Sequence, residues 1–363
     1  MRHYFLIIFS LIFLTACGED ADGPEAIAPT DLVLKADIGE NGLVEFEASA
    51  QGANYYNYYF GGLSNETATY SADGKASYRY TESGSFTVKV QAHTSQSVYT
   101  SETANVTVEV EIEVPTDGYS TPESYEGMTL VWRDEFDGNS LNEEDWTFEI
   151  GNNGGWGNNE LEYYQKENTT VEDGHLIIEA RKESKGGFNY TSSRIKTQDK
   201  QVFKYGRIDI RAVLPKGQGI WPALWMLGNN ITEVSWPKCG EIDIMEMVGG
   251  SVDNRDATVH STLHWDSNGH AFTGDSYELS SGLFADEFHV FTLIWNENTI
   301  TSYVDDQQFF IIDIEPADLN EFHEEFFLLF NVAVGGDWPG SPDANTVFPQ
   351  RMIVDYVRVF QEN

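Results

Sequence analysis

Basic residues are scarce in this sequence. Its 363 residues include 21 Lys and Arg against 59 Asp and Glu, which gives a formal net charge of −38 at pH 7. Nucleic-acid phosphates and anionic lipid head groups are bound largely through Lys and Arg. This balance therefore argues against a nucleic-acid partner and against charge-driven adsorption to an anionic membrane. It also disfavours a heavily sulfated or carboxylated substrate.

Cysteine is nearly absent, since the chain holds only Cys17 and Cys239. If Cys17 is acylated, no intramolecular disulfide can form, and stability must come from a packed core. Cys239 directly precedes a run of acidic residues, where a catalytic thiol is one interpretation. No histidine is near it in the sequence, which favours a small buried apolar residue instead.

Long apolar runs are also missing, apart from Tyr4–Leu14 behind Arg2 and His3. This run is too short to span a bilayer comfortably and has the length of a secretory hydrophobic region. It ends in Leu14–Gly18, which resembles a bacterial lipobox. The resemblance implies a signal peptide over residues 1–17, with Cys17 as a lipid-modified N-terminus.

Residues 18–27 are rich in Gly, Ala, Pro and acidic residues, and we interpret them as a tether. The acidic residues just after Cys17 resemble the export signal of surface lipoproteins in Bacteroidetes-type bacteria. This implies an outer-membrane lipoprotein of the bacterial cell envelope, exposed at the cell surface. Ordinary secretion with a free cysteine is the alternative.

The sequence contains no internal repeat, no phosphate-binding glycine loop and no zinc-ligand spacing. His260 and His264 alternate on a predicted strand, but two histidines without a third ligand make a weak metal site.

Residues 28–114 contain short segments of alternating apolar and polar residues, separated by turn residues at intervals typical of a small β-sandwich. The predicted strands are Leu32–Leu34, Leu43–Phe46, Tyr55–Phe60, Ser77–Tyr80, Ser85–Val90 and Val106–Val114. The stretch Tyr78–Val88 resembles the end of a PKD-type, immunoglobulin-like domain. A carbohydrate-binding module is the alternative, but the stretch contains no tryptophan, which favours a spacer.

Residues 115–124 are interpreted as a linker, and residues 125–363 hold all nine tryptophans. This last part has no helical periodicity and many segments of alternating polarity. It predicts a single large antiparallel β domain, a sandwich or jelly roll with a concave binding face. The fold class is therefore all-β, with two domains.

The segment Gly240–Glu246 is the most informative part of the chain. In a plain strand Glu241 and Asp243 share one face, and Glu246 falls on the opposite face with Ile242 and Ile244. A β-bulge near Met245 would return Glu246 to the face of the other two acids. The acidic pattern alone could arise by chance in so acidic a chain.

The stretch Trp236–Glu246 resembles the active-site strand of glycoside hydrolase family 16. The Glu-x-Asp-x-x-Glu spacing is that of its laminarinase-like members, whereas lichenases have one residue fewer. Further segments resemble the same branch in the same order: Gly155–Tyr164, Ser193–Thr197, Gly219–Leu227, Ser261–Trp265, Asn331–Gly340, Phe348–Gln350 and Val354–Val359.

The resemblance implies an endo-β-1,3-glucanase of laminarin-type glucans that acts with retention of configuration. Glu241 would be the nucleophile, Glu246 the acid and then the base, and Asp243 a hydrogen-bonding partner of the nucleophile. Because three like charges this close cannot all stay ionised cheaply, at least one pKa should rise, which favours a protonated Glu246. No cofactor is expected for catalysis.

A neutral glucan needs aromatic platforms and polar groups that read hydroxyls. Trp221, Trp225 and Trp236 are the first platform candidates, followed by Trp338 and Trp156, whereas Trp132, Trp146 and Trp295 are expected in the core. By resemblance, the remaining substrate contacts are Asn159, Glu160, Arg194, His264 and Gln350. A structural calcium ion is expected at Glu135, Gly174 and Asp355.

Two alternatives stay open: a mixed-linkage β-1,3-1,4-glucanase, and a glucan-binding surface lectin of the same fold without turnover. The three acids argue against the lectin, because a binding protein could keep the tryptophans and lose the acids. We expect a monomer.

Overall fold

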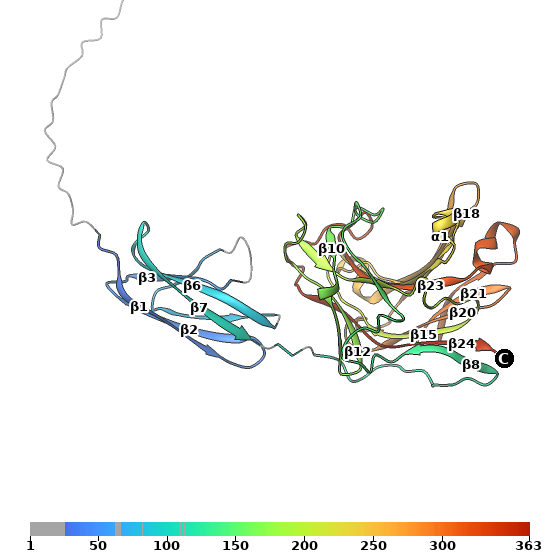
Figure 1. The fold of residues 1–363 in the computed structure, drawn as a ribbon, viewed down its shortest axis with the longest axis horizontal. Helices are drawn as coiled ribbons and strands as arrows, with labels where there is room; N and C mark the ends of the chain where they lie inside the picture. The colour runs from blue at the N-terminus through green and yellow to red at the C-terminus, as the bar shows by residue number, and fades with distance from the viewer. Residues whose placement is uncertain (1–25, 62–66, 82, 109, 112) are drawn as a thin grey trace, which may run out of the picture. The chain divides into compact units, whose positions relative to one another are not determined.

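The computed structural model describes residues 26–61, 67–81, 83–108, 110–111 and 113–363 (Figure 1). The predicted signal peptide, Cys17 and most of the tether lie outside the described residues. The chain divides into two compact units, residues 1–110 and 111–363. Among the described residues, no helix combines the length and the apolar character that crossing a membrane requires.

The first unit is a β-sandwich of a three-stranded sheet, in the order β1-β2-β5, and a four-stranded sheet, in the order β4-β3-β6-β7. Both sheets bury side chains in one apolar cluster that includes Phe46, Tyr58 and Val90. The strands are β1 (Thr30–Ile38), β2 (Leu43–Gln51), β3 (Tyr55–Tyr59), β4 (Thr69–Ser71), β5 (Lys75–Arg79), β6 (Gly84–Ser95) and β7 (Val98–Val108).

Each predicted strand of this unit overlaps an observed one, and β4 was not predicted. The sandwich is confirmed, whereas its immunoglobulin-like character stays a prediction. The predicted strand Val106–Val114 is wrong at residues 110–111 and 113–114, the described residues beyond β7, which ends at Val108.

The predicted linker over residues 115–124 is also wrong, because this stretch packs on the second unit. Gly118 forms a β-bridge with Phe288, and the Thr121 N–H donates to the Tyr356 hydroxyl at 2.8 Å. The alternation of the sequence continues past Val110, so it could not reveal that the chain changes units there.

The second unit contains two large antiparallel sheets, and Figure 1 shows them as stacked layers. The eight-stranded sheet has the order β11-β12-β24-β15-β20-β21-β22, with β8 paired to β24. Its strands are β8 (Met128–Asp134), β11 (Thr169–Glu172), β12 (His175–Ala180), β15 (Gly206–Val213), β20 (His289–Trp295), β21 (Thr299–Val304), β22 (Gln307–Asp313) and β24 (Gln350–Glu362).

The seven-stranded sheet has the order β19-β18-β17-β16-β23-β14-β9. Its strands are β9 (Thr147–Glu149), β14 (Arg194–Lys196), β16 (Ile220–Gly228), β17 (Glu241–Glu246), β18 (Thr258–Asp266), β19 (His270–Glu278) and β23 (Phe326–Val334). The smaller elements are the parallel pair β10 (Glu162–Tyr164) and β13 (Tyr190–Ser192), the helix α1 (Ile231–Val234) and the 3₁₀ turns Lys166–Asn168, Val252–Ala257 and Ala317–His323.

One apolar core fills the space between these two sheets. It includes Met226, Ile242, Leu263 and Phe330 from the seven-stranded sheet. Trp146 and Trp295 are fully buried, and Trp132 packs against the same cluster, so the prediction that these three belong to the core is confirmed. The predicted all-β jelly-roll sandwich is confirmed, and the opposite face of the seven-stranded sheet is free to carry the site.

Candidate active site

The face of the seven-stranded sheet that turns away from the core lines a cleft of about 810 Å³. In Figure 1, the segments around β10 rise on one side of β23, and α1 and β18 rise on the other. Alternation along each strand sends every second side chain into this cleft. The register places Arg194, Asn331, Ala223, Glu246 and His260 in one row across five strands.

The three acids of β17 reach the cleft through a β-bulge. Asp243 pairs with Trp225 and Thr262, whereas Glu246 pairs with Ala223 and His260. Between these pairs, Ile244 and Met245 face a single residue of β18, so the strand contains one extra residue. Both apolar side chains are buried in the core. The bulge predicted near Met245 is confirmed.

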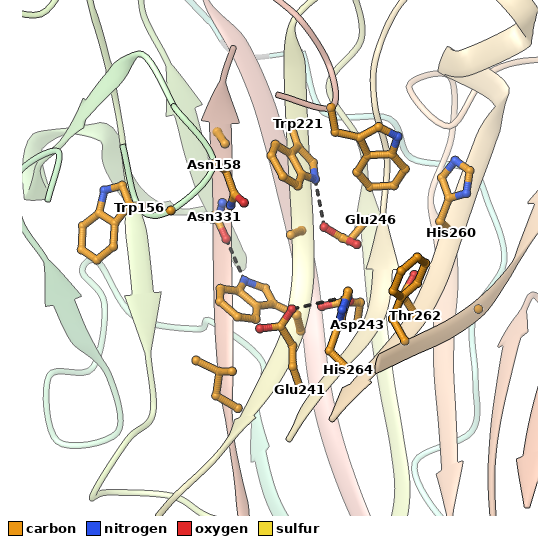
Figure 2. A pocket seen from close by; sticks show the side chains of 18 of the residues that line it. Trp156, Asn158, Trp221, Glu241, Asp243, Glu246, His260, Thr262, His264 and Asn331 are labelled. Atoms are coloured by element: carbon orange, nitrogen blue, oxygen red, sulfur yellow. Dashed lines mark hydrogen bonds and ion pairs between the residues drawn. The ribbon is translucent and has the colours of Figure 1, made fainter. Parts of the chain in front are cut away.

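Glu241 lies at the start of β17, and Figure 2 shows it beside His264. The indole N–H of Trp236 donates to Oε2 at 3.1 Å, and His264 Nε2 lies 3.7 Å from Oε1. Burial raises the pKa of Glu241 to about 7, while the positive potential of His264 opposes the rise. Glu241 therefore exchanges its proton near neutral pH.

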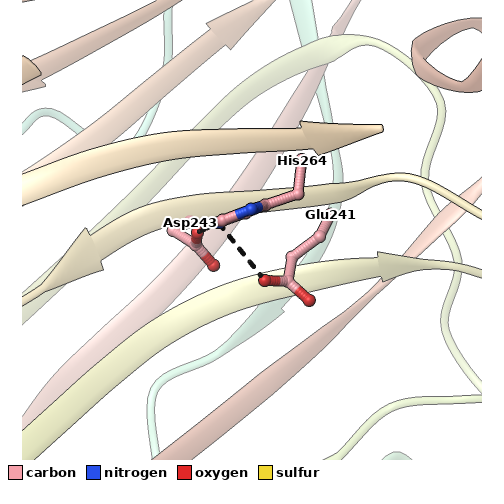
Figure 3. Close-up of side chains that lie close together, drawn as sticks. All are labelled: Glu241, Asp243 and His264. Atoms are coloured by element: carbon pink, nitrogen blue, oxygen red, sulfur yellow. Dashed lines mark ion pairs between the residues drawn. The ribbon is translucent and has the colours of Figure 1, made fainter. Parts of the chain in front are cut away.

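Asp243 lies beside both other acids and is almost fully buried. Its Oδ2 lies 3.2 Å from His264 Nε2, and Figure 3 shows the imidazole between Asp243 and Glu241. Burial and the nearby Glu241 raise the pKa of Asp243 well above its ordinary value. Whether Asp243 is protonated therefore depends on the charge of Glu241 and Glu246 beside it.

Glu246 accepts a hydrogen bond from the indole N–H of Trp221 at 3.0 Å (Figure 2). Burial raises the pKa of Glu246 well above its ordinary value, and Asp243 adds to the rise. The direction of this shift favours the protonated form of Glu246, the form that the sequence analysis expects. A protonated carboxyl and a carboxyl that ionises near pH 7 on one sheet face are the two groups that glycoside cleavage requires.

All five predicted platform residues line the cleft: Trp156, Trp221, Trp225, Trp236 and Trp338. Trp236 and Trp338 are each about half exposed, whereas Trp225 donates its indole N–H to Asn331 Oδ1 at 2.8 Å. The cleft therefore has an aromatic surface on both sides of the acids.

Arg194 and Glu160 form the polar wall of the cleft on the β14 side. The Arg194 guanidinium is 4.5 Å from the Trp156 ring centre and 4.8 Å from that of Trp225, and its Nε donates to Glu149 at 2.6 Å. Glu160 accepts hydrogen bonds from Asn158 at 3.0 Å and from the Tyr164 hydroxyl at 2.9 Å. These bonds hold the side chains at fixed positions beside the tryptophans.

Two predicted substrate contacts do not line the cleft. The Asn159 amide donates to both carboxylate oxygens of Asp337, at 2.9 and 3.0 Å, and its neighbour Asn158 lines the cleft instead. Asn159 has a φ of 57°, in the left-handed region. The alternation expected of an extended chain therefore does not predict which of the two neighbouring asparagines faces the cleft. Gln350 accepts from the Lys216 N–H and donates to the Val347 carbonyl, outside the cleft.

The side chains predicted to hold calcium do not fit that ion as they are arranged. Both carboxylate oxygens of Glu135 accept from Arg358, and Asp355 accepts from Arg211 at 2.7 Å. Arg358 therefore takes both carboxylate oxygens of Glu135, and Arg211 takes one of the two oxygens of Asp355, where calcium would need free oxygen ligands. Gly174 forms the turn between β11 and β12 with a φ of 77°.

Several cleft residues were not predicted, among them His260, Thr262, Asn331 and Phe272. Asn331 is the sole polar residue of the fully buried strand β23. A single amide in an otherwise apolar strand was the sequence feature that could have identified it as a cleft residue. His264 was predicted at the cleavage point, where the structure places it beside Glu241 and Asp243. Within the described residues, these three form the one group whose ligand atoms lie within 4.8 Å of one another, as a metal site would require.

Comparisons with known proteins agree with this geometry. Residues 157–358 match the sequence profile described as glycosyl hydrolases family 16, and residues 69–234 match that of the beta-glucan synthesis-associated proteins SKN1/KRE6/Sbg1. The catalytic domain of an endo-1,3-beta-glucanase (laminarinase) from Thermotoga petrophila RKU-1 is 49% identical, with a TM-score of 0.62. The match covers 66% of this chain and 100% of that domain.

Two curated relatives are similar over about two thirds of this chain. The clotting factor G alpha subunit of Tachypleus tridentatus is 39% identical over 236 residues, which are 64% of this chain. The glucan endo-1,3-beta-glucosidase A1 of Niallia circulans is 39% identical over 272 residues, which are 68% of this chain. The matches span 34% and 39% of the length of those two proteins. From the profile match and the cleft geometry together, the chain belongs to glycosyl hydrolase family 16.

Proposed function

We propose that this protein is an endo-acting hydrolase of β-1,3-glucan that retains the configuration of the anomeric carbon. The observation that carries the proposal is the pair Glu241 and Glu246 on one face of β17. Their surroundings raise the pKa of Glu241 only to about 7 and that of Glu246 well above its ordinary value, which suits a nucleophile and an acid. The Thermotoga petrophila domain, which is 49% identical, is itself an endo-1,3-beta-glucanase. Aromatic and polar side chains line the cleft on both sides of the acids. Sugar units on either side of the cleaved bond can therefore bind, as attack within a polymer requires.

In the first step the ionised Glu241 attacks the anomeric carbon, and a covalent glycosyl-enzyme forms. Glu246 gives its proton to the glycosidic oxygen, so the leaving chain departs as a neutral alcohol. In the second step Glu246, now ionised, takes a proton from water as that water attacks the anomeric carbon. The bond to Glu241 breaks, and two inversions give net retention.

The neighbours of the two acids support these roles. Trp236 donates to Glu241 and favours its ionised form, whereas Asp243 favours the protonated form of Glu246. His264 lies close enough to Glu241 and Asp243 to stabilise negative charge that returns to either of them.

The nearest alternative substrate is mixed-linkage β-1,3-1,4-glucan. The one-residue bulge, by resemblance, favours laminarin over lichenan. A binding protein without turnover is the alternative from another class, and the three intact acids argue against it.

The proposal is tested by incubating the protein with laminarin, lichenan and agarose and identifying the products. New oligosaccharides of mixed length from laminarin are expected. Glu241→Gln should abolish hydrolysis and leave glucan affinity largely intact, because the amide cannot act as a nucleophile. Binding without new reducing ends in the unaltered protein would remove the enzyme function.

We also propose, from the lipobox-like sequence, that Cys17 carries a lipid that anchors the protein at the outer membrane, facing outward. Acyl chains add about 0.8 kcal/mol of membrane affinity per buried CH₂. Cys17→Ala should release the protein from the membrane fraction, and unchanged membrane association would refute lipidation. The expected monomer is tested by light scattering.

A further inference from the structure

A row of aromatic rings crosses the outer face of the four-stranded sheet in the first unit. Tyr70, Tyr55, His93 and Tyr99 contribute one ring each from β4, β3, β6 and β7. Successive ring centres are 5.5, 4.7 and 4.9 Å apart, and the Tyr55 and His93 rings are inclined by only 6°. Four neighbouring strands span about 14 Å at a strand spacing of about 4.8 Å, so the row is longer than one sugar ring.

The row faces outward because β3 alternates. Tyr56 and Tyr58 turn into the core, where their hydroxyls bond to the Ala50 N–H at 2.9 Å and the Gly74 carbonyl. Tyr55 lies on the other face, opposite His93. At the two ends of the row, Tyr70 is 65% exposed and Tyr99 is 45% exposed.

The centre of the row is fixed by hydrogen bonds. His93 is almost fully buried between its neighbours, and its ring nitrogens lie 3.3 Å from the Asn57 amide nitrogen and 3.2 Å from the Ser95 carbonyl. Beside the row, the Tyr59 hydroxyl donates to Gln91 Oε1 at 3.3 Å. The face therefore combines rings with amide groups that can read hydroxyls.

This face carries no carboxylate at the outward positions of the four strands within the described residues. The chain as a whole has 59 Asp and Glu among 363 residues, so the absence of carboxylates is a property of this surface and not of the whole chain. The outer face of the other sheet has the usual charges, with Lys35, Glu47 and Lys75 in one row. The one charged side chain at the outward positions of the described strands is Lys89, whose ammonium lies 4.1 Å from the centre of the Tyr59 ring. A surface of rings and amides without acids suits a neutral ligand, whose hydroxyls can also accept from Lys89.

We propose that the face around Tyr55, Tyr70, His93 and Tyr99 binds a neutral β-glucan chain as a second site, separate from the catalytic cleft. The choice of β-1,3-glucan rests on the proposed function of the cleft. A second site on the same chain raises the effective concentration of polymer at the cleft without new contacts there. The sequence analysis favoured a spacer over a carbohydrate-binding module because this stretch contains no tryptophan. In the proposed site, tyrosine and histidine rings take the place of tryptophan.

The test measures adsorption of the full chain to insoluble β-1,3-glucan particles, with Glu241→Gln in every variant so that the particles stay intact. The double variant Tyr70→Ala/Tyr99→Ala removes the two exposed ends of the row. Adsorption should weaken about tenfold, since exposed aromatic contacts are worth about 0.5–1.5 kcal/mol each and 1.4 kcal/mol is tenfold. The control is Val33→Ala on β1, which is 48% exposed on the other sheet and should change nothing.

Hydrolysis of a soluble β-1,3-linked tetrasaccharide is measured in parallel with native Glu241. Tyr70→Ala/Tyr99→Ala should leave its kcat/KM unchanged, because the substrate reaches the cleft without the row. Unchanged adsorption in the double variant, or an equal loss in Val33→Ala, would overturn the second site while leaving cleft activity intact. If the tetrasaccharide is not cleaved but the tyrosines control adsorption, the catalytic proposal fails and the second site stands.

Discussion

Asp243→Asn should move the alkaline limb of the pH–rate profile to lower pH. Burial raises the pKa of Glu246 first, and the charge and hydrogen bond of Asp243 raise it further. Asparagine removes the charge, keeps the shape and can donate to an ionised Glu246, so the pKa of Glu246 must fall. A hydrogen bond to a charged group is worth about 1.5–3 kcal/mol, which is about one to two pKa units at 1.36 kcal/mol per unit.

The assay is kcat/KM on laminarin from about pH 4 to pH 10, since this ratio reports the pKa values of the free enzyme. The acid limb follows ionisation of Glu241, near pH 7, and the alkaline limb follows loss of the Glu246 proton. A matched control is Trp236→Phe, which removes a donor to Glu241. It should raise the pKa of Glu241 and move only the acid limb, to higher pH. An alkaline limb that stays in place in Asp243→Asn would refute the assignment of Asp243 to Glu246.

Two further variants test the surroundings of the acids. Trp221→Phe removes the indole donor to Glu246, so the pKa of Glu246 should rise and the alkaline limb should move to higher pH. The value of kcat/KM should fall about tenfold, because the lost hydrogen bond is worth about 1.5 kcal/mol. An unchanged pH profile would contradict this role of Trp221. Arg194→Ala leaves the partly buried Glu149 with Lys196 as its remaining partner at 2.7 Å, so the change should cost about 1.5–3 kcal/mol and lower the Tm of the second unit by about 5 °C in calorimetry. An unchanged Tm would show that the pair is not structural.

The local chemistry of β17 could be predicted from the sequence because polarity and strand period conflict there. Only a bulge places Glu246 with Glu241 and also buries Ile244 and Met245. Trp146 and Trp295 could be told from the cleft tryptophans because they lie outside the segments that resemble the family, and both are buried in the core.

Other features depend on contacts that a local pattern does not contain. Whether Asn158 or Asn159 faces the cleft is decided by a left-handed residue in a loop. Gln350 belongs to a segment that resembles the family, but it begins β24 of the eight-stranded sheet. Its side chain therefore lies outside the cleft, which the seven-stranded sheet forms. The change of units near Val110 leaves the alternating pattern intact, because both units are β structures.

The stereochemistry of the first product tests the central assignment most directly. Laminarin is mixed with the protein in an NMR tube, and the anomeric proton of the new reducing end is followed before mutarotation. Glu241 as nucleophile and Glu246 as acid and base predict that the β-anomer appears first and the α-anomer grows in later. If the α-anomer appears first, or if no new reducing end forms, the two acids do not perform the double displacement described here.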